Sequence, residues 1–148
     1  MKPLHLKNYL QLIRNSTGSR LFRHSYFIDD GGKEQDVLAA GDLACAFYVS
    51  AILKIFDKIT ALHATVIGTV ADLKKNGWRE VAIGDQLREG DVLVWGPELE
   101  EGGSTHQHIG FYIGRELAVS NNAKKRCPIR HHYNFHGNRK IIRVFRAD

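Results

Sequence analysis

The spacing of apolar residues changes near Gly77, and this change constrains the fold more than any other feature of the chain. Before Gly77, apolar residues recur every three or four positions, which predicts helices over residues 4–14, 42–57 and 65–76. After Gly77, the apolar segments are short, rich in β-branched and aromatic residues, and separated by turns: DVLVWG, HIGFYIG, LAVSN, HHYNF and KIIRVFR. Three helices followed by about five strands predict an α+β domain, with N-terminal helices packed on an antiparallel sheet. A further short strand is expected at SYFID, before the turn DDGGK.

Length and composition favour a single domain over residues 1–148. No apolar run approaches the about 20 residues needed to cross a bilayer, so no membrane span is expected. The first fifteen residues are interrupted by charged side chains and lack the apolar centre of a secretory signal. We therefore expect a cytoplasmic protein, unless a route other than general secretion exports it.

The net charge of +5 favours polyanionic surroundings, such as nucleic acid or anionic cell-wall polymers. The basic residues cluster in KKRCPIRHH and NRKIIRVFR, without the stacking-aromatic motif of RNA-recognition domains. We therefore expect no specific nucleic-acid partner. An anionic wall polymer and a basic face that is only solvated both stay open.

Cys45 lies near the start of the predicted helix over residues 42–57, whose other side chains are almost all apolar. Such a helix is expected to be buried at the centre of the fold, with Asp42 as its N-terminal cap. A lone cysteine is most often a structural residue of the core. A helix N-terminus and a neighbouring imidazole, however, lower the pKa of a thiol and make it a nucleophile. Two cysteines do not form a disulfide framework, so free thiols are expected.

His108 is the strongest candidate, among eight histidines, for the base that would pair with this thiol. It opens the segment HIGFYIG, and a strand there would hold the imidazole firmly over a neighbouring helix end. Gly110, two residues further along, leaves space on the same face for a substrate or the thiol.

A catalytic imidazole also needs a partner that orients its second nitrogen. If Arg115–Glu116 alone forms the turn after HIGFYIG, Gly110 faces Asn121, whose side-chain oxygen could accept the imidazole N–H. A three-residue turn would bring Ser120 to that face, and further slippage would bring Asn122. Asn121 is the preferred candidate because an amide oxygen is the better acceptor.

Three segments together resemble the NlpC and CHAP groups of papain-like cysteine peptidases and amidases: LACAFYVSAIL, QLREGDVLVWG and HIGFYIGRELAVSN. They span residues 42–121, a little over half of the chain. The shared order is a cysteine at a helix start, a GDVLVW segment, and a histidine that opens the next strand. The resemblance implies a papain-like fold and an acyl-enzyme reaction on an amide bond, often in the stem peptides of peptidoglycan.

In that reaction Cys45 would be the nucleophile, His108 the base and later the acid, and Asn121 the third member. The backbone N–H of Cys45 would contribute to the oxyanion hole. No cofactor or metal is implied, and the partner would be a peptide or peptidoglycan-like substrate. The chain departs from the NlpC pattern in two places: ACAF replaces Asp-Cys-Ser-Gly, and Ser or Asn stands where His is common.

Other interpretations remain. The pair of Cys45 and His108 could carry out acyl transfer or deamidation on a different amide. A degenerate, non-enzymatic domain could instead bind an anionic polymer through KKRCPIRHH and NRK. Cys127 with the histidines that follow it and His106 suggests a metal site, but the spacing is not that of a usual zinc site.

Overall fold

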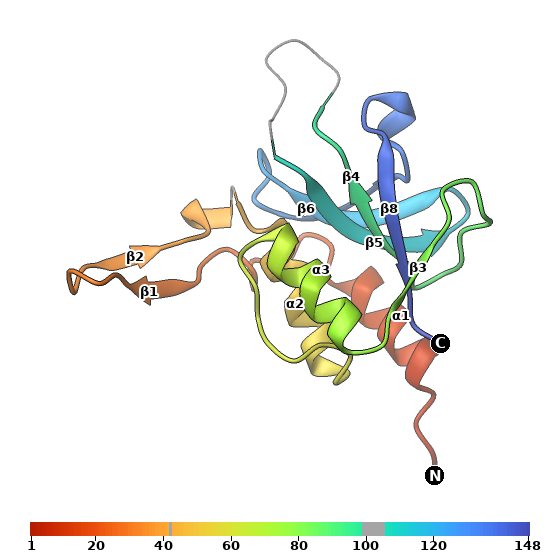
Figure 1. Cartoon of the computed structure of the whole chain (residues 1–148), viewed down its shortest axis with the longest axis horizontal. Helices are drawn as coiled ribbons and strands as arrows, with labels where there is room; N and C mark the ends of the chain where they lie inside the picture. The colour runs from red at the N-terminus through yellow and green to blue at the C-terminus, as the bar shows by residue number, and fades with distance from the viewer. Residues whose placement is uncertain (42, 99–105) are drawn as a thin grey trace.

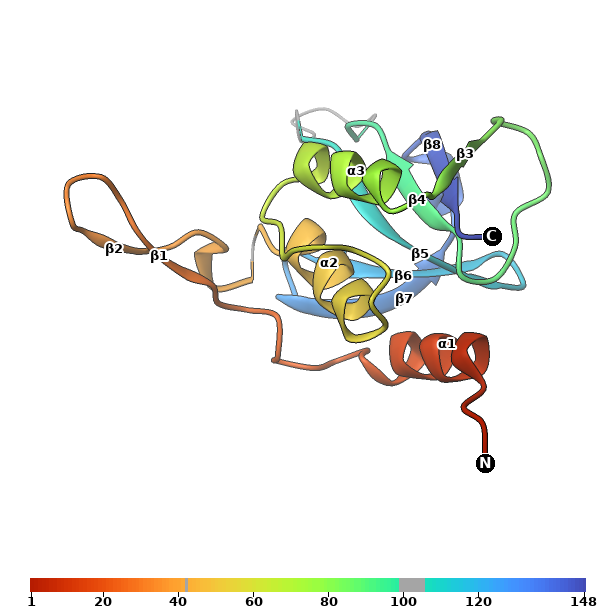
Figure 2. The ribbon, with the colours of Figure 1, turned by 60° about the horizontal axis from the view of Figure 1, so that its bottom comes forward.

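The structure is a computed structural model that describes residues 1–41, 43–98 and 106–148 and has an α+β architecture (Figure 1). Its three α-helices are α1 (His5–Asn15), α2 (Cys45–Ile55) and α3 (Val66–Lys75). They lie together on one side of a six-stranded antiparallel sheet (Figure 2). The α+β class, the antiparallel sheet and the three helices agree with the sequence prediction. No helix in the described part of the chain combines the length and apolar character needed to cross a membrane.

The main sheet has the strand order β3-β8-β4-β5-β6-β7. Its strands are β3 (Arg79–Val81), β4 (Val92–Trp95), β5 (His108–Gly114), β6 (Leu117–Asn122), β7 (Cys127–His132) and β8 (Ile141–Arg146). The prediction of about five strands omits β3, because three residues are too few to show a periodicity. The strand predicted at HHYNF is also misplaced, because β7 begins at Cys127 and pairs with β6 over its whole length.

The sheet is buried on both faces. On the helix side, α2 packs against β5 and β6 in a core that includes Tyr48, Ile52 and Phe111. On the opposite side, Leu93 and Trp95 of β4 belong to a smaller core, against which Leu87, Tyr112, Tyr133, Phe135 and Ile141 pack. Because both faces of β4 are buried, all four of its residues are apolar, and polar and apolar residues do not alternate along it.

A buried ion pair joins the start of β4 to the end of β8. Arg146 donates from Nε and Nη2 to the two carboxylate oxygens of Asp91, at 2.8 and 2.6 Å. Asp91 is 2% exposed and Arg146 is 8% exposed, so each charge depends on the other for compensation. The Asp of the GDVLVW segment therefore has a structural role.

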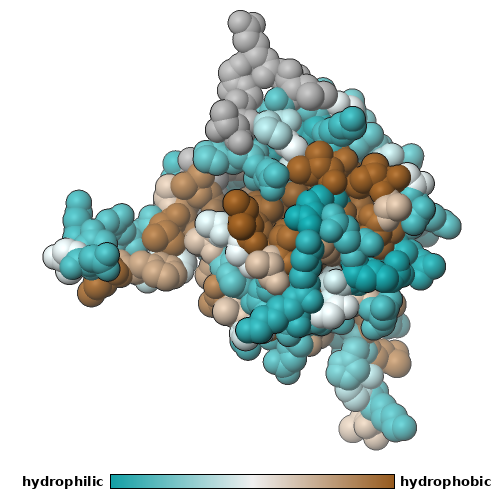
Figure 3. Space-filling model, viewed as in Figure 1, coloured by the Kyte–Doolittle hydropathy of each residue, from teal (hydrophilic) through white to brown (hydrophobic). Residues whose placement is uncertain are grey.

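The strands β1 (Tyr26–Ile28) and β2 (Glu34–Asp36) form a hairpin that projects from the body (Figures 1 and 2). The predicted SYFID strand is thereby confirmed as β1. Apolar side chains gather over the base of this hairpin and over the N-terminal end of α3 (Figure 3). These two regions border the cavity described below.

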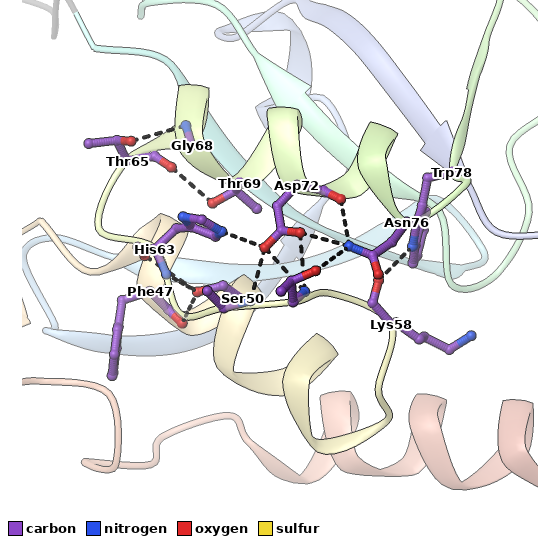
Figure 4. Close-up of polar contacts among 12 residues, drawn as sticks. Phe47, Ser50, Lys58, His63, Thr65, Gly68, Thr69, Asp72, Asn76 and Trp78 are labelled. Atoms are coloured by element: carbon purple, nitrogen blue, oxygen red, sulfur yellow. Dashed lines mark hydrogen bonds and ion pairs between the residues drawn. The ribbon is translucent and has the colours of Figure 1, made fainter.

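The loop between α2 and α3 is held by a polar network centred on Asp72 of α3 (Figure 4). Its carboxylate accepts hydrogen bonds from the backbone N–H groups of Thr60 and Ala61, at 2.9 to 3.1 Å. Nε2 of His63 lies 2.7 Å from Oδ2 of Asp72. Burial alone would raise the pKa of Asp72, but these hydrogen bonds outweigh it and lower the pKa to about 2. The network fixes the chain just before residues 64–67, which line the cavity.

Replacing Asp72 by Ala should lower the free energy of unfolding by about 2 kcal/mol, because the partly buried backbone N–H groups of Thr60 and Ala61 and the ring of His63 lose their acceptor. The contribution of Asp72 should be complete above about pH 4, where an unfolded Asp is ionised, and should disappear as the pH falls toward 2. Urea unfolding of the wild type, Asp72→Ala and the control Asp30→Ala, which changes an exposed carboxylate in the hairpin turn, measures the effect. Equal losses in the two variants would contradict this role.

Candidate active site

A cavity of about 770 Å³ opens between the first turns of α2 and α3 and the adjoining ends of β5, β6 and β7. Much of its wall is apolar. The described lining residues that carry reactive or hydrogen-bonding side chains include Cys45, Glu98, His106, His108, Ser120, Asn121, His131 and Arg139. All three predicted catalytic residues, Cys45, His108 and Asn121, line this cavity.

Cys45 is the first residue of α2, which confirms its predicted place in the first turn of this helix. The predicted cap, Asp42, lies outside the described residues. Ala44 is the residue that flanks the helix start, and it makes no side-chain capping bond.

The predicted lowering of the pKa of Cys45 is wrong. Burial raises the pKa of this thiol, and it outweighs hydrogen bonds from the backbone of Ile109 and Ala46 and the charge of Arg139. A thiol at a helix start therefore stays protonated when desolvation exceeds the stabilisation that the helix end supplies. The bond with Ile109, the residue after His108, also shows that the thiol lies at the beginning of β5.

His108 is the first residue of β5, and its ring lies 5.5 Å from the ring of Trp95 and 5.9 Å from that of Phe135, between centroids. Burial lowers the pKa of His108 to about 3, with further contributions from the charge of Arg139 and from His131. The imidazole is therefore neutral at physiological pH.

The side chain within hydrogen-bonding distance of Nε2 of His108 is that of Ser120, and not that of Asn121. The distance from Nε2 to Oγ of Ser120 is 2.8 Å. The two-residue turn Arg115–Glu116 is present, and both of its residues have the positive φ that such a turn requires. An irregularity between Tyr112 and Gly114, however, shifts the register by one residue.

Because of this shift, Gly110 faces Ser120 across the hairpin. Asn121 then belongs to the opposite face of β6, where it is 4% exposed and donates from Nδ2 to the carbonyl oxygen of Gly41 at 2.8 Å. Oδ1 of Asn121 is buried without a hydrogen-bond partner in the described structure. The third candidate for the orienting role, Asn122, accepts a hydrogen bond from the backbone of Lys125.

Sequence reasoning missed His131, which also lines the cavity and contacts Ser120. Its Nε2 is 2.7 Å from Oγ of Ser120, and its Nδ1 is 2.8 Å from the carbonyl oxygen of His132. Ser120 pairs with Ile129, so His131 is the diagonal neighbour of Ser120 on the same face. A correct start for β7 would have revealed this contact, but the predicted strand began at His131 itself.

Arg139 supplies a positive charge to the wall of the cavity. It is 8% exposed, and its Nη2 lies 3.1 Å from Oε1 of Glu98, which is half-exposed. Its charge acts on both Cys45 and His108: it lowers the pKa of the thiol and that of the imidazole. Arg139 therefore favours a neutral imidazole and opposes the effect of burial on the thiol.

Two other groups of residues were candidates for a reactive site, but their geometry does not fit one. Ser50, His63 and Asp72 resemble a triad in composition, but the bonds between Ser50 and His63 involve the backbone of His63 and not its ring (Figure 4). Ser50 is also fully buried. Within the described residues, no group of three His, Cys, Asp or Glu side chains is arranged to hold a metal ion, and Cys127 is a free thiol.

Comparison with known proteins assigns no family to this chain. No family model matches it, and no curated protein matches it significantly. The functional interpretation therefore depends on the residues of the cavity and their geometry.

Proposed function

We propose that this protein is a cysteine amidohydrolase with a papain-like fold of the NlpC or CHAP type, acting on peptidoglycan stem peptides or similar amides. The observation that carries the proposal is the shared cavity of Cys45 and His108. Cys45 stands at the start of a buried helix and His108 at the start of a strand, both line the cavity, and Nε2 of His108 lies within hydrogen-bonding distance of Ser120. The sequence resemblance in residues 42–121 supports the same reaction.

In the proposed reaction, the sulfur of Cys45 attacks the amide carbonyl carbon while His108 takes the thiol proton. The carbonyl oxygen becomes an oxyanion, for which the backbone N–H of Cys45 is a suitable donor. His108 then gives its proton to the departing amine, which leaves a thioester on Cys45. A water molecule, deprotonated by His108, hydrolyses the thioester and restores the thiol.

The pKa values of the site support proton transfer during attack rather than a resting ion pair. The pKa of Cys45 is raised and that of His108 is lowered, so both groups are neutral before substrate binds. An imidazolium formed in this site is a strong acid, and it therefore protonates a leaving amine readily. The nearby charge of Arg139 stabilises negative charge on sulfur as attack proceeds.

Replacing Cys45 by Ser should abolish turnover of peptidoglycan stem peptides, because a hydroxyl is a much weaker nucleophile than a thiol here. Mass spectrometry of the wild type should detect an acyl adduct, which peptide mapping should locate on Cys45. Analysis of the reaction solution should detect the released amine. Cys127→Ser is the matched control, because Cys127 does not line the described part of the cavity, and it should keep most of the activity. Turnover by Cys45→Ser at the wild-type rate, or an adduct on Cys127, would contradict the proposal.

A further inference from the structure

Three residues that line the cavity, His108, Ser120 and His131, are joined by a continuous chain of hydrogen bonds that ends at a backbone carbonyl. In order, it joins Nε2 of His108, Oγ of Ser120, Nε2 of His131, Nδ1 of His131 and the oxygen of His132. The successive distances are 2.8, 2.7 and 2.8 Å. All three are within the normal range for strong hydrogen bonds.

The direction of this chain follows from its last member. A carbonyl oxygen can only accept, so Nδ1 of His131 must carry a proton and donate it to His132. A neutral imidazole has one N–H, which leaves Nε2 of His131 as an acceptor. The hydroxyl of Ser120 must then donate to His131.

The single hydroxyl proton of Ser120 is thereby used, so its oxygen can only accept from His108. Nε2 of His108 must therefore be the protonated nitrogen, and Nδ1 keeps the lone pair. We infer that His131 is a positioning residue which, through Ser120, selects the tautomer of His108 whose Nδ1 can act as a base. This inference deepens the proposed function, but the tautomer itself is a property of the resting protein.

The surroundings of His131 favour this direction of the hydrogen bonds. Its ring stacks on Phe135 at 4.1 Å between centroids and contacts Trp95 at 5.6 Å, which restricts rotation of the imidazole. Charged or titratable neighbours are His132, Arg139 and, through Ser120, His108. Burial lowers the pKa of His131 to about 4, and this keeps its Nε2 available as an acceptor near neutral pH.

The same chain makes the site sensitive to acid. When His131 is protonated, both of its nitrogens donate, and Ser120 must accept from His131. The hydroxyl proton then points to His108, whose Nε2 becomes an acceptor and whose Nδ1 becomes protonated. Protonation of His131 therefore places a proton on Nδ1 of His108, so this nitrogen can no longer act as a base.

Long-range ¹H–¹⁵N NMR of histidine side chains tests the inference on the intact protein without any substrate. At pH 7, His108 should be the Nε2–H tautomer and His131 the Nδ1–H tautomer. When His131 becomes protonated at low pH, His108 should shift toward the Nδ1–H tautomer. An Nδ1–H tautomer of His108 at pH 7 would overturn the inference.

The variant His131→Phe keeps an aromatic ring of similar size but removes the acceptor for Ser120. Nδ1–H should then become populated in His108, and kcat on stem peptides should fall at least about tenfold with little change in KM. His132→Phe is the matched control on the same strand, since only its backbone oxygen belongs to the chain. Ser120→Ala breaks the chain without enlarging any side chain and should reproduce the NMR change.

An unchanged tautomer in both His131→Phe and Ser120→Ala would overturn the inference. The NMR result is independent of turnover, so it separates failure of this inference from failure of the proposed function. Loss of the tautomer preference in His132→Phe alone would also overturn it.

Discussion

The packing of α2 against β5 and β6 is the interaction on which the rest of the structure depends. Apolar side chains such as Tyr48, Ile52 and Phe111 are excluded from solvent at this contact, and together they form the largest core of the protein. The same contact places the thiol of Cys45 near the backbone of Ile109, at the beginning of β5. That Cys45 and His108 line one cavity is therefore a consequence of core packing.

Burial has a second effect, because it sets the protonation states of the residues that it brings together. It raises the pKa of Cys45 and lowers the pKa of His108 and His131, in each case as the largest cause. A neutral thiol and neutral imidazoles are less costly to keep in an apolar wall than charged groups. In the proposed reaction, these neutral groups exchange a proton only when an amide carbonyl is attacked.

The sequence was sufficient to predict the α+β class, the three helices and the start of a buried helix at Cys45, and both Cys45 and His108 line one cavity. These features follow from periodicities that extend over ten or more residues, or from residues at the ends of long elements. The partner of His108 could not be predicted, because one irregularity between Tyr112 and Gly114 exchanges Asn121 for Ser120. In a strand, a shift of one residue reverses the face of every side chain beyond it.

His131 and the pKa of Cys45 show two other limits of sequence reasoning. His131 reaches Ser120 only because β7 pairs with β6, and Pro128 and the basic residues of β7 conceal that strand in the sequence. The pKa of Cys45 depends on how far the thiol is desolvated, which a motif does not specify. Register and burial are properties of the folded chain, whereas periodicity is local.

The rate of alkylation of Cys45 by iodoacetamide at pH 7 tests the central claim, that His108 is the base for this thiol, most directly. The wild type and His108→Gln should be compared, with Cys127 in the same molecules as the internal reference. We expect the substitution to slow modification of Cys45 at least about tenfold, because a neutral thiol then lacks a base, and to leave the rate at Cys127 unchanged. Equal rates at Cys45 in the two proteins would contradict the account.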